Sequence, residues 1–178
     1  MAVLHKTRAF IWALTLSTLP FTAACVRRHH QAHAQAQADV TVLAADLPAA
    51  PDWARPMIGQ PLSAVAAAKA QCEGYADRVV TVYKGVHGGV RAIGWSWDPD
   101  SHKPLQHILV VDPTGTVVGA GQPGGEPRPD VVAARPGVVT TPDVGWVAST
   151  QVTSGQVRIY GLTGSGAACQ IGVLSVRG

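Results

Sequence analysis

The stretch QHILVVDPTGTVVGAG, residues 106–121, decides the fold class of this chain. Two runs rich in valine, isoleucine and leucine flank an Asp-Pro-Thr-Gly segment, and β-branched residues favour strands. Pro113 suits the second position of a tight turn, and Gly115 adds conformational freedom close to it. The segment therefore predicts a β-hairpin, a pattern that the rest of the chain repeats.

Seven runs of this kind follow one another after Cys72, each rich in Val, Ile, Trp, Tyr or Thr and bounded by Gly, Pro or Asp. They are residues 77–84, 89–97, 106–112, 116–121, 144–152, 156–162 and 168–176. The connections have no room for crossover helices, apart from one helical turn after Asp130 that Pro136 ends. We therefore expect an all-β fold, an antiparallel sandwich of about seven strands.

The N-terminus has the three parts of an export signal. Lys6 and Arg8 precede the apolar run AFIWALTLSTLP, and small residues in FTAAC lead to Cys25. A membrane span is the alternative, but residues 9–26 offer only 18 positions with several threonines, and a bilayer core needs about 20 apolar ones. We expect a secretory signal over residues 1–24.

The leader resembles that of bacterial lipoproteins, in which a cysteine after small residues is lipidated once the signal is cleaved. TAAC departs from the preferred pattern at Thr22, where leucine is usual, and ordinary cleavage after Ala24 is the alternative. The resemblance implies that Cys25 becomes the acylated first residue of the mature protein. It places the protein in the bacterial cell envelope, facing the periplasm, anchored in the outer rather than the inner membrane.

After the leader, VRRHHQAHAQAQADV (residues 26–40) alternates alanine with glutamine and histidine without an apolar period, and we expect residues 25–52 to form a lipidated, disordered tether. Residues 53–71 form a linker with one short helix in PLSAVAAAKAQ, and residues 72–178 form the β-domain. With Cys25 acylated, Cys72 and Cys169 remain as a pair in an oxidising compartment. We expect a disulfide between them, two free thiols being the alternative, with Cys169, Ile171 and Val173 facing the core.

Charge and motifs exclude several function classes. Lys6 and Arg8 lie in the leader, which leaves twelve basic and eleven acidic residues, so no basic surface for nucleic acid is expected. GAGQPG at residues 119–124 resembles a phosphate-binding loop, but Pro123 prevents the helix that such a loop needs. DPDSH at residues 98–102 lacks the glycine and glutamate of a calcium loop. We therefore expect neither a cofactor nor a metal.

The strand ending in GWSWDPDSH offers candidate ligand-binding residues. Residues two apart in a strand share a face, so Trp95 and Trp97 lie on the side of Ile93. We expect that side to be the core, with Trp95 buried more securely than Trp97. Trp97 adjoins the turn with Asp98, Asp100 and His102, where a ring beside carboxylates would suit a sugar.

The order of CEGYADRV, GWSWDPDSHKPLQHILVVD, GTVVGAG, RPDV, DVGW and VRIYGL resembles a small immunoglobulin-like β-sandwich module of bacterial envelope proteins. The resemblance covers residues 72–176 and implies a binding or packing role without catalytic residues. In that family the module sometimes follows a multi-spanning membrane part, which this sequence lacks.

Together these patterns predict a non-enzymatic envelope lipoprotein whose disulfide-stapled sandwich binds a polysaccharide or a membrane-protein partner. The ligand-binding candidates are Trp97, Asp98, Asp100 and His102. The alternative is an envelope hydrolase acting on glycans, with Asp98, Asp100 and Asp112 as its clustered carboxylates.

Overall fold

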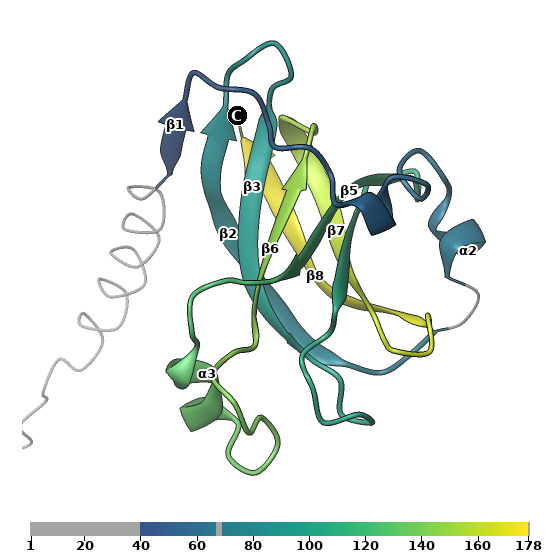
Figure 1. Cartoon of the computed structure of the whole chain (residues 1–178), viewed down its shortest axis with the longest axis vertical. Helices are drawn as coiled ribbons and strands as arrows, with labels where there is room; N and C mark the ends of the chain where they lie inside the picture. The colour runs from purple at the N-terminus through teal and green to yellow at the C-terminus, as the bar shows by residue number, and fades with distance from the viewer. Residues whose placement is uncertain (1–39, 67–68, 178) are drawn as a thin grey trace, which may run out of the picture. The chain divides into compact units, whose positions relative to one another are not determined.

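The computed structural model describes residues 40–66 and 69–177, and in this part strands dominate (Figure 1). The strands are β1 (Thr41–Leu43), β2 (Glu73–Tyr83), β3 (Gly89–Trp97), β4 (His107–Val111), β5 (Val117–Pro123), β6 (Gly145–Thr150), β7 (Ser154–Leu162) and β8 (Ala168–Arg177). The short helical segments are the 3-10 helix η1 (Asp52–Ala54), α2 (Leu62–Val65) and α3 (Pro129–Ala134). The expected mostly β fold is confirmed, and each of the seven predicted runs forms a strand.

All eight strands belong to one mixed sheet in the order β1-β2-β3-β6-β5-β4-β7-β8. Only β1 and β2 pair in parallel, and the other neighbours pair antiparallel. Strands β4, β5 and β6 form consecutive neighbours, while β3 returns beside β6 and β7 beside β4. These two returns are Greek-key connections.

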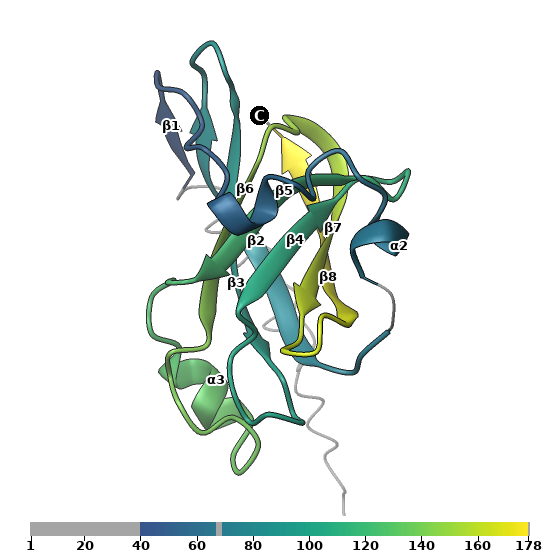
Figure 2. The same ribbon diagram turned by 45° about the vertical axis from the view of Figure 1, so that its right-hand side comes forward.

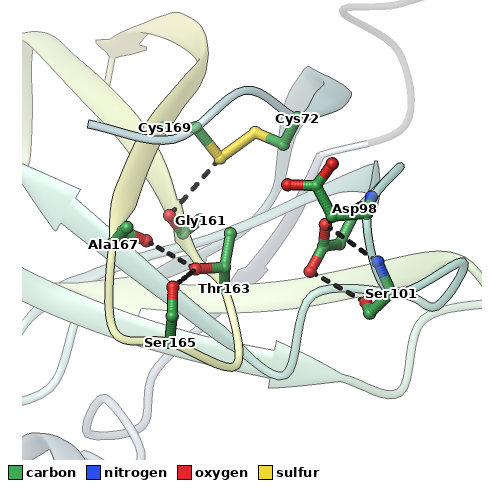
Figure 3. The surroundings of a disulfide bond; sticks show 9 residues. Cys72, Asp98, Ser101, Gly161, Thr163, Ser165, Ala167 and Cys169 are labelled. Carbon is green, nitrogen blue, oxygen red and sulfur yellow. Dashed lines mark hydrogen bonds between the residues drawn. A yellow bond between two sulfur atoms is a disulfide. The ribbon is translucent and has the colours of Figure 1, made fainter. Parts of the chain in front are cut away.

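The sheet curls around a shared core, so that β2 and β8 approach each other although they lie far apart in the strand order (Figure 1, Figure 2). A Cβ placed on Gly172 of β8 would lie 2.6 Å from the Cβ of Ala76 in β2. Just before β2, the Ala70 amide donates a 2.9 Å hydrogen bond to the carbonyl of Ala168. The Cys72–Cys169 disulfide closes the same seam with a Cα–Cα distance of 6.0 Å, and the predicted pairing is confirmed (Figure 3).

The main core lies inside the curled sheet and draws side chains from β2, β3, β4, β6, β7 and β8. A second cluster lies under η1 and α2, where Trp53 and Leu62 pack against buried residues such as Leu109 and Val117. A third cluster lies under α3 and contains Trp97, Val131 and Val139. Arg135, directly after α3, pairs with Glu73 of β2 and ties this cover to the sheet.

The two tryptophans of β3 share a face as expected, but the face was assigned wrongly. Ala92 contributes to the main core, and Gly94 and Ser96 are buried on that same side. A side chain larger than glycine at position 94 would collide with the ring of Trp146, which supplies the bulk that we had assigned to Trp95. Trp95 and Trp97 lie on the outer side, where the α3 region covers Trp97 to 1% exposure and leaves Trp95 half-buried.

Strand β8 departs from simple alternation at one position. Cys169 and Ile171 are buried as expected, but Val173 is 49% exposed. The pairing with β7 shifts there, because Tyr160 pairs with Gln170 whereas Ile159 pairs with Gly172. This β-bulge adds one residue to β8 and reverses the faces that follow.

The segment before β2 differs most from the expectations. Part of the predicted tether contacts the sheet, because β1 pairs with β2 and the Leu47 amide donates a 2.8 Å hydrogen bond to the carbonyl of His87. The predicted helix over residues 61–71 shortens to the four residues of α2. Of the described helices, none combines the length and apolar character that crossing a bilayer requires.

Candidate functional site

A hollow of about 670 Å³ lies on the outer side of β2, β3 and β6. Arg91 and Ile93 of β3 line it, alternating with the buried Ala92, and the loop of residues 124–128 forms one wall. Its other charged lining residues are Asp77, Arg78, Glu126 and Arg128. The strands thus provide a rigid floor, and the glycine- and proline-rich loop leaves space above it.

A second hollow of about 330 Å³ adjoins the first and lies between residues 48–51 and the strands β5 and β6. The two hollows share Arg91, Gly124 and Val147. We call the two together the outer groove. Its second wall is Pro-Ala-Ala-Pro, whose small and rigid residues carry no polar side chain, so that polar contacts there must come from the floor.

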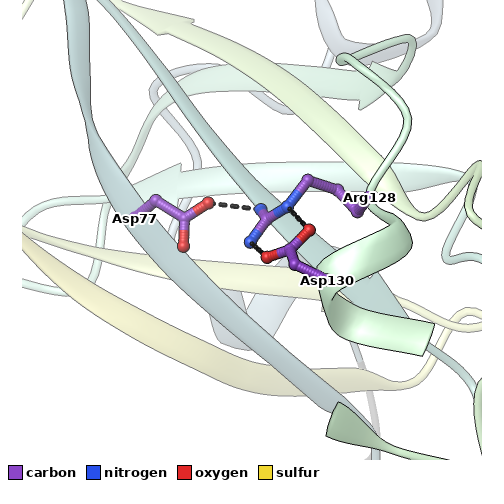
Figure 4. A network of polar contacts seen from close by, with 3 residues as sticks. All are labelled: Asp77, Arg128 and Asp130. Carbon is purple, nitrogen blue, oxygen red and sulfur yellow. Dashed lines mark hydrogen bonds and ion pairs between the residues drawn. The ribbon is translucent and has the colours of Figure 1, made fainter. Parts of the chain in front are cut away.

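A charged network organises the larger hollow, with Arg128 at its centre (Figure 4). Nε and Nη2 of Arg128 donate hydrogen bonds of 2.9 and 2.8 Å to the two carboxylate oxygens of Asp130. Nη1 of Arg128 donates a 2.5 Å hydrogen bond to Asp77 of β2. Two carboxylates therefore neutralise this guanidinium and hold the loop before α3 against the sheet.

The two carboxylates respond differently to Arg128. Hydrogen bonds from the Arg128 guanidinium lower the pKa of Asp130 below its ordinary value. Burial raises the pKa of Asp77, and the opposing attraction of Arg128 is smaller than this desolvation effect. Arg128 itself has a raised pKa, chiefly through its hydrogen bonds to Asp130. The bidentate ion pair with Asp130 is therefore the stronger interaction of Arg128. The interaction with Asp77 is weaker in net effect, because burial of the Asp77 carboxylate carries a desolvation penalty.

Arg91 lies in the same groove, and none of the described carboxylates forms an ion pair with it. Its guanidinium carbon lies 5.8 Å from the centre of the Tyr83 ring, within the range of a cation–π contact. Its Nε is buried and has no hydrogen-bond partner among the described residues. Carboxylates already occupy Arg128, whereas the Arg91 guanidinium has no carboxylate partner among the described residues. Of these two arginines, Arg91 is therefore the better candidate to bind an anion.

In the predicted ligand-binding turn, the Asp98 carboxylate is occupied by hydrogen bonds within the turn itself (Figure 3). Oδ1 of Asp98 accepts hydrogen bonds from the amides of Asp100 and Ser101 at 3.0 and 3.4 Å, and Oδ2 accepts the Ser101 hydroxyl at 2.8 Å. Asp98 is only 5% exposed, and its backbone pairs with Lys103. Its carboxylate therefore closes the turn, which leaves Asp100 and His102 as exposed side chains on it.

Trp97 offers no ring face to a ligand, because it is 1% exposed beneath the α3 region. His102 adopts a backbone φ of 53°, in the left-handed region, which fits the tight turn that Asp98 closes. The four predicted residues are thus neighbours in the turn at the end of β3, with two of them enclosed.

The carboxylates of the alternative hydrolase belong to separate turns. Asp98 closes the turn that follows β3, and Asp112 lies in the turn between β4 and β5. Asp112 also caps its own hairpin turn, where Oδ1 accepts the Thr114 hydroxyl at 2.7 Å and the Thr116 amide at 2.9 Å.

Among the described residues, His, Cys, Asp and Glu side chains form no group of three that could hold a metal ion. The lipidation residue Cys25 lies outside the described residues.

The charged residues of the outer groove were missed in the sequence. Arg78, Arg91 and Arg128 lie in three separate segments, and each looks like an ordinary solvent-exposed cation in its own context. The signal that was present is the alternation of VRAIGW, which places Arg91 on the face opposite Ala92. Comparison of the chain with family models, curated proteins and solved structures found no match.

Proposed function

We propose that this chain is an envelope lipoprotein, anchored through Cys25, whose β-domain binds a polysaccharide in the outer groove without turning it over. The observation that carries the proposal is the groove itself, which joins hollows of about 670 and 330 Å³ through Arg91. Two adjoining open hollows suit a polymer, since a small ligand is usually enclosed on most sides.

The chemistry of the lining supports a sugar ligand. Thr81, Gln122 and Ser149 line the floor with hydroxyl and amide groups, and arginines add charged donors. Such groups can donate to and accept from sugar hydroxyls. Small residues form part of the walls, Pro48, Ala49, Gly124 and Gly125 among them, and leave room for a sugar ring beside them.

The resemblance to an immunoglobulin-like sandwich belongs to the same proposal. Greek-key connections and a core shared by opposite parts of the curled sheet support it. The Cys72–Cys169 disulfide supports an oxidising compartment, as expected of a domain outside the cytoplasm.

Two measurements test the proposal on the full chain produced in a bacterium with an envelope. Mass spectrometry of the mature N-terminus should show an acylated Cys25, and Cys25→Ser should release the protein from the membrane fraction. A soluble mature form beginning further along the chain would reject the anchor.

Binding is tested by affinity electrophoresis of the detergent-solubilised chain in gels that contain neutral or acidic polysaccharides. Ala49→Trp places an indole in the smaller hollow and should weaken retention. Ala133→Trp places the same indole on exposed α3 and serves as the matched control. The groove is rejected if no polysaccharide retards the protein, or if both variants behave alike.

A further inference from the structure

The charges of the outer groove are unevenly distributed. Arg91 lines both hollows, whereas Arg78, Arg128, Asp77 and Glu126 line only the larger one. Arg91 is the one charged residue in the described lining of the smaller hollow, where Gln122 and Ser149 add polar groups. The smaller hollow is therefore cationic, whereas acidic side chains offset the cations of the larger one.

The isolation of Arg91 is costly for the folded protein. A partly desolvated guanidinium without a carboxylate partner loses hydration that nothing replaces. The Tyr83 ring at 5.8 Å offsets part of this loss, but it cannot accept a hydrogen bond from the buried Nε in the plane of the guanidinium. Arg128 in the same groove differs from Arg91, because its guanidinium donates three hydrogen bonds to two carboxylates.

The guanidinium of Arg91 is suited to a carboxylate. Arginine presents parallel N–H groups that bind both oxygens of a carboxylate at once, and the contact is charge-assisted. Gln122 lines the same hollow from β5 and can accept from or donate to a hydroxyl of the ligand. A ligand with a carboxylate next to hydroxyl groups would satisfy both residues.

An acidic sugar fits this surface better than an acidic peptide. Extended peptides commonly bind by adding to a free strand edge. The floor strands β3, β6 and β5 are each paired on both sides, so the groove presents a sheet face without a free edge. The aromatic residue in its lining, Trp146, is 1% exposed, so that charged and polar donors must carry recognition in place of ring stacking.

We propose that the outer groove binds an acidic polysaccharide, with the carboxylate of one sugar residue held by Arg91 in the smaller hollow. This inference rests on the proposed function, since it names the chemical class of the same ligand. Glu126 and Asp77 line the larger hollow but not the smaller one, and this placement favours a carboxylate bound to Arg91 from within the smaller hollow.

The test measures dissociation constants of the full chain, solubilised in a non-ionic detergent, for three probes. Polygalacturonate carries free carboxylates, its methyl-esterified form carries neutralised ones, and dextran is neutral. The wild type should bind polygalacturonate about tenfold or more tightly than its ester, the size expected for one charge-assisted contact. Arg91→Gln should remove this preference, and Arg91→Lys should keep part of it because the charge remains.

Two controls separate recognition from structure. Arg158→Gln alters an arginine on β7 that donates to the Pro113 carbonyl outside the groove, and it should leave all three constants unchanged. The melting temperature of Arg91→Gln should stay at or above the wild-type value, because an unneutralised charge has been removed. A lowered melting temperature with equal loss of all binding would assign Arg91 to the fold and overturn the inference.

The remaining outcomes are distinct. If none of the probes and no other polysaccharide binds, the proposed function fails and the inference fails with it. If the ester and dextran bind as tightly as polygalacturonate, and Arg91→Gln changes nothing, the polysaccharide function stands and the acidic ligand is rejected. Arg91-dependent binding of polyglutamate without glycan binding would identify an acidic peptide instead.

Discussion

Replacing Trp97 by alanine should destabilise the domain more than replacing Trp95, although the two residues share one face of β3. Trp97 is 1% exposed and packs with Val131, Val139 and Val144 beneath the α3 region. A buried aromatic side chain of this size covers about 150 to 250 Å², and tryptophan-to-alanine changes in cores cost about 3 to 5 kcal/mol. Domains of this kind are stable by only about 5 to 15 kcal/mol, so the loss is a large fraction.

Trp95 provides the matched control, because it is half-buried and packs against the same cluster from its edge. Its replacement should cost about half as much, in proportion to the apolar area removed from the core. Urea unfolding followed by far-UV circular dichroism gives both free energies without depending on tryptophan fluorescence. A larger loss for Trp95→Ala than for Trp97→Ala would refute the placement of Trp97 under the α3 region.

Three further changes test the sheet and its surroundings. Replacing both Cys72 and Cys169 by serine opens a loop with a sequence separation of 97, which should cost about 4 to 5 kcal/mol in urea unfolding; an unchanged midpoint would contradict it. Gly94→Ala places a Cβ 2.1 Å from a backbone oxygen and should lower the melting temperature, whereas Gly164→Ala, with no atom within 4 Å, should not. Burial lowers the pKa of His107 from its ordinary 6.5, so the folded state favours the neutral ring. Stability from this residue is therefore fully present above pH 6.5 and is lost as the pH falls below 6.5 through the lowered pKa of the folded state, and His107→Gln should flatten the urea-midpoint profile there.

The strands could be predicted because their signals are local. The runs of β-branched residues and the Gly, Pro and Asp boundaries gave all seven strands from β2 to β8, and the Asp-Pro-Thr-Gly turn gave the β4–β5 hairpin. The order of the strands could not be predicted, since it depends on pairings such as β3 with β6 across some fifty residues. Strand β1 was missed because its three residues are too short for a periodic signal and gain their structure from β2.

The faces of β3 show a subtler limit. Alternation correctly placed Ile93, Trp95 and Trp97 together, but it cannot say which side is the core. We chose the side with the larger residues, yet Trp146 of β6 fills the core beside Gly94 and makes small residues necessary there. The outer side is covered only where α3 folds over the end of β3, which explains why two tryptophans on one face differ so much in exposure.

The candidate site could not be predicted because its decisive property is a difference in pairing between two arginines. Arg128 has Asp130 two residues away, a proximity that the sequence displays, but its second partner Asp77 is 51 residues distant. Arg91 has no acidic residue close to it in the sequence. The same is true of many solvent-exposed arginines without a binding role, so the sequence does not distinguish Arg91 from them. Only the folded sheet, which buries the Arg91 Nε without a hydrogen-bond partner among the described residues while it gives Arg128 two carboxylates, separates the paired arginine from the unpaired one. The sequence signals for ligand binding point instead to the aromatic and acidic turn at the end of β3, where the fold encloses Trp97 and uses Asp98 to close the turn.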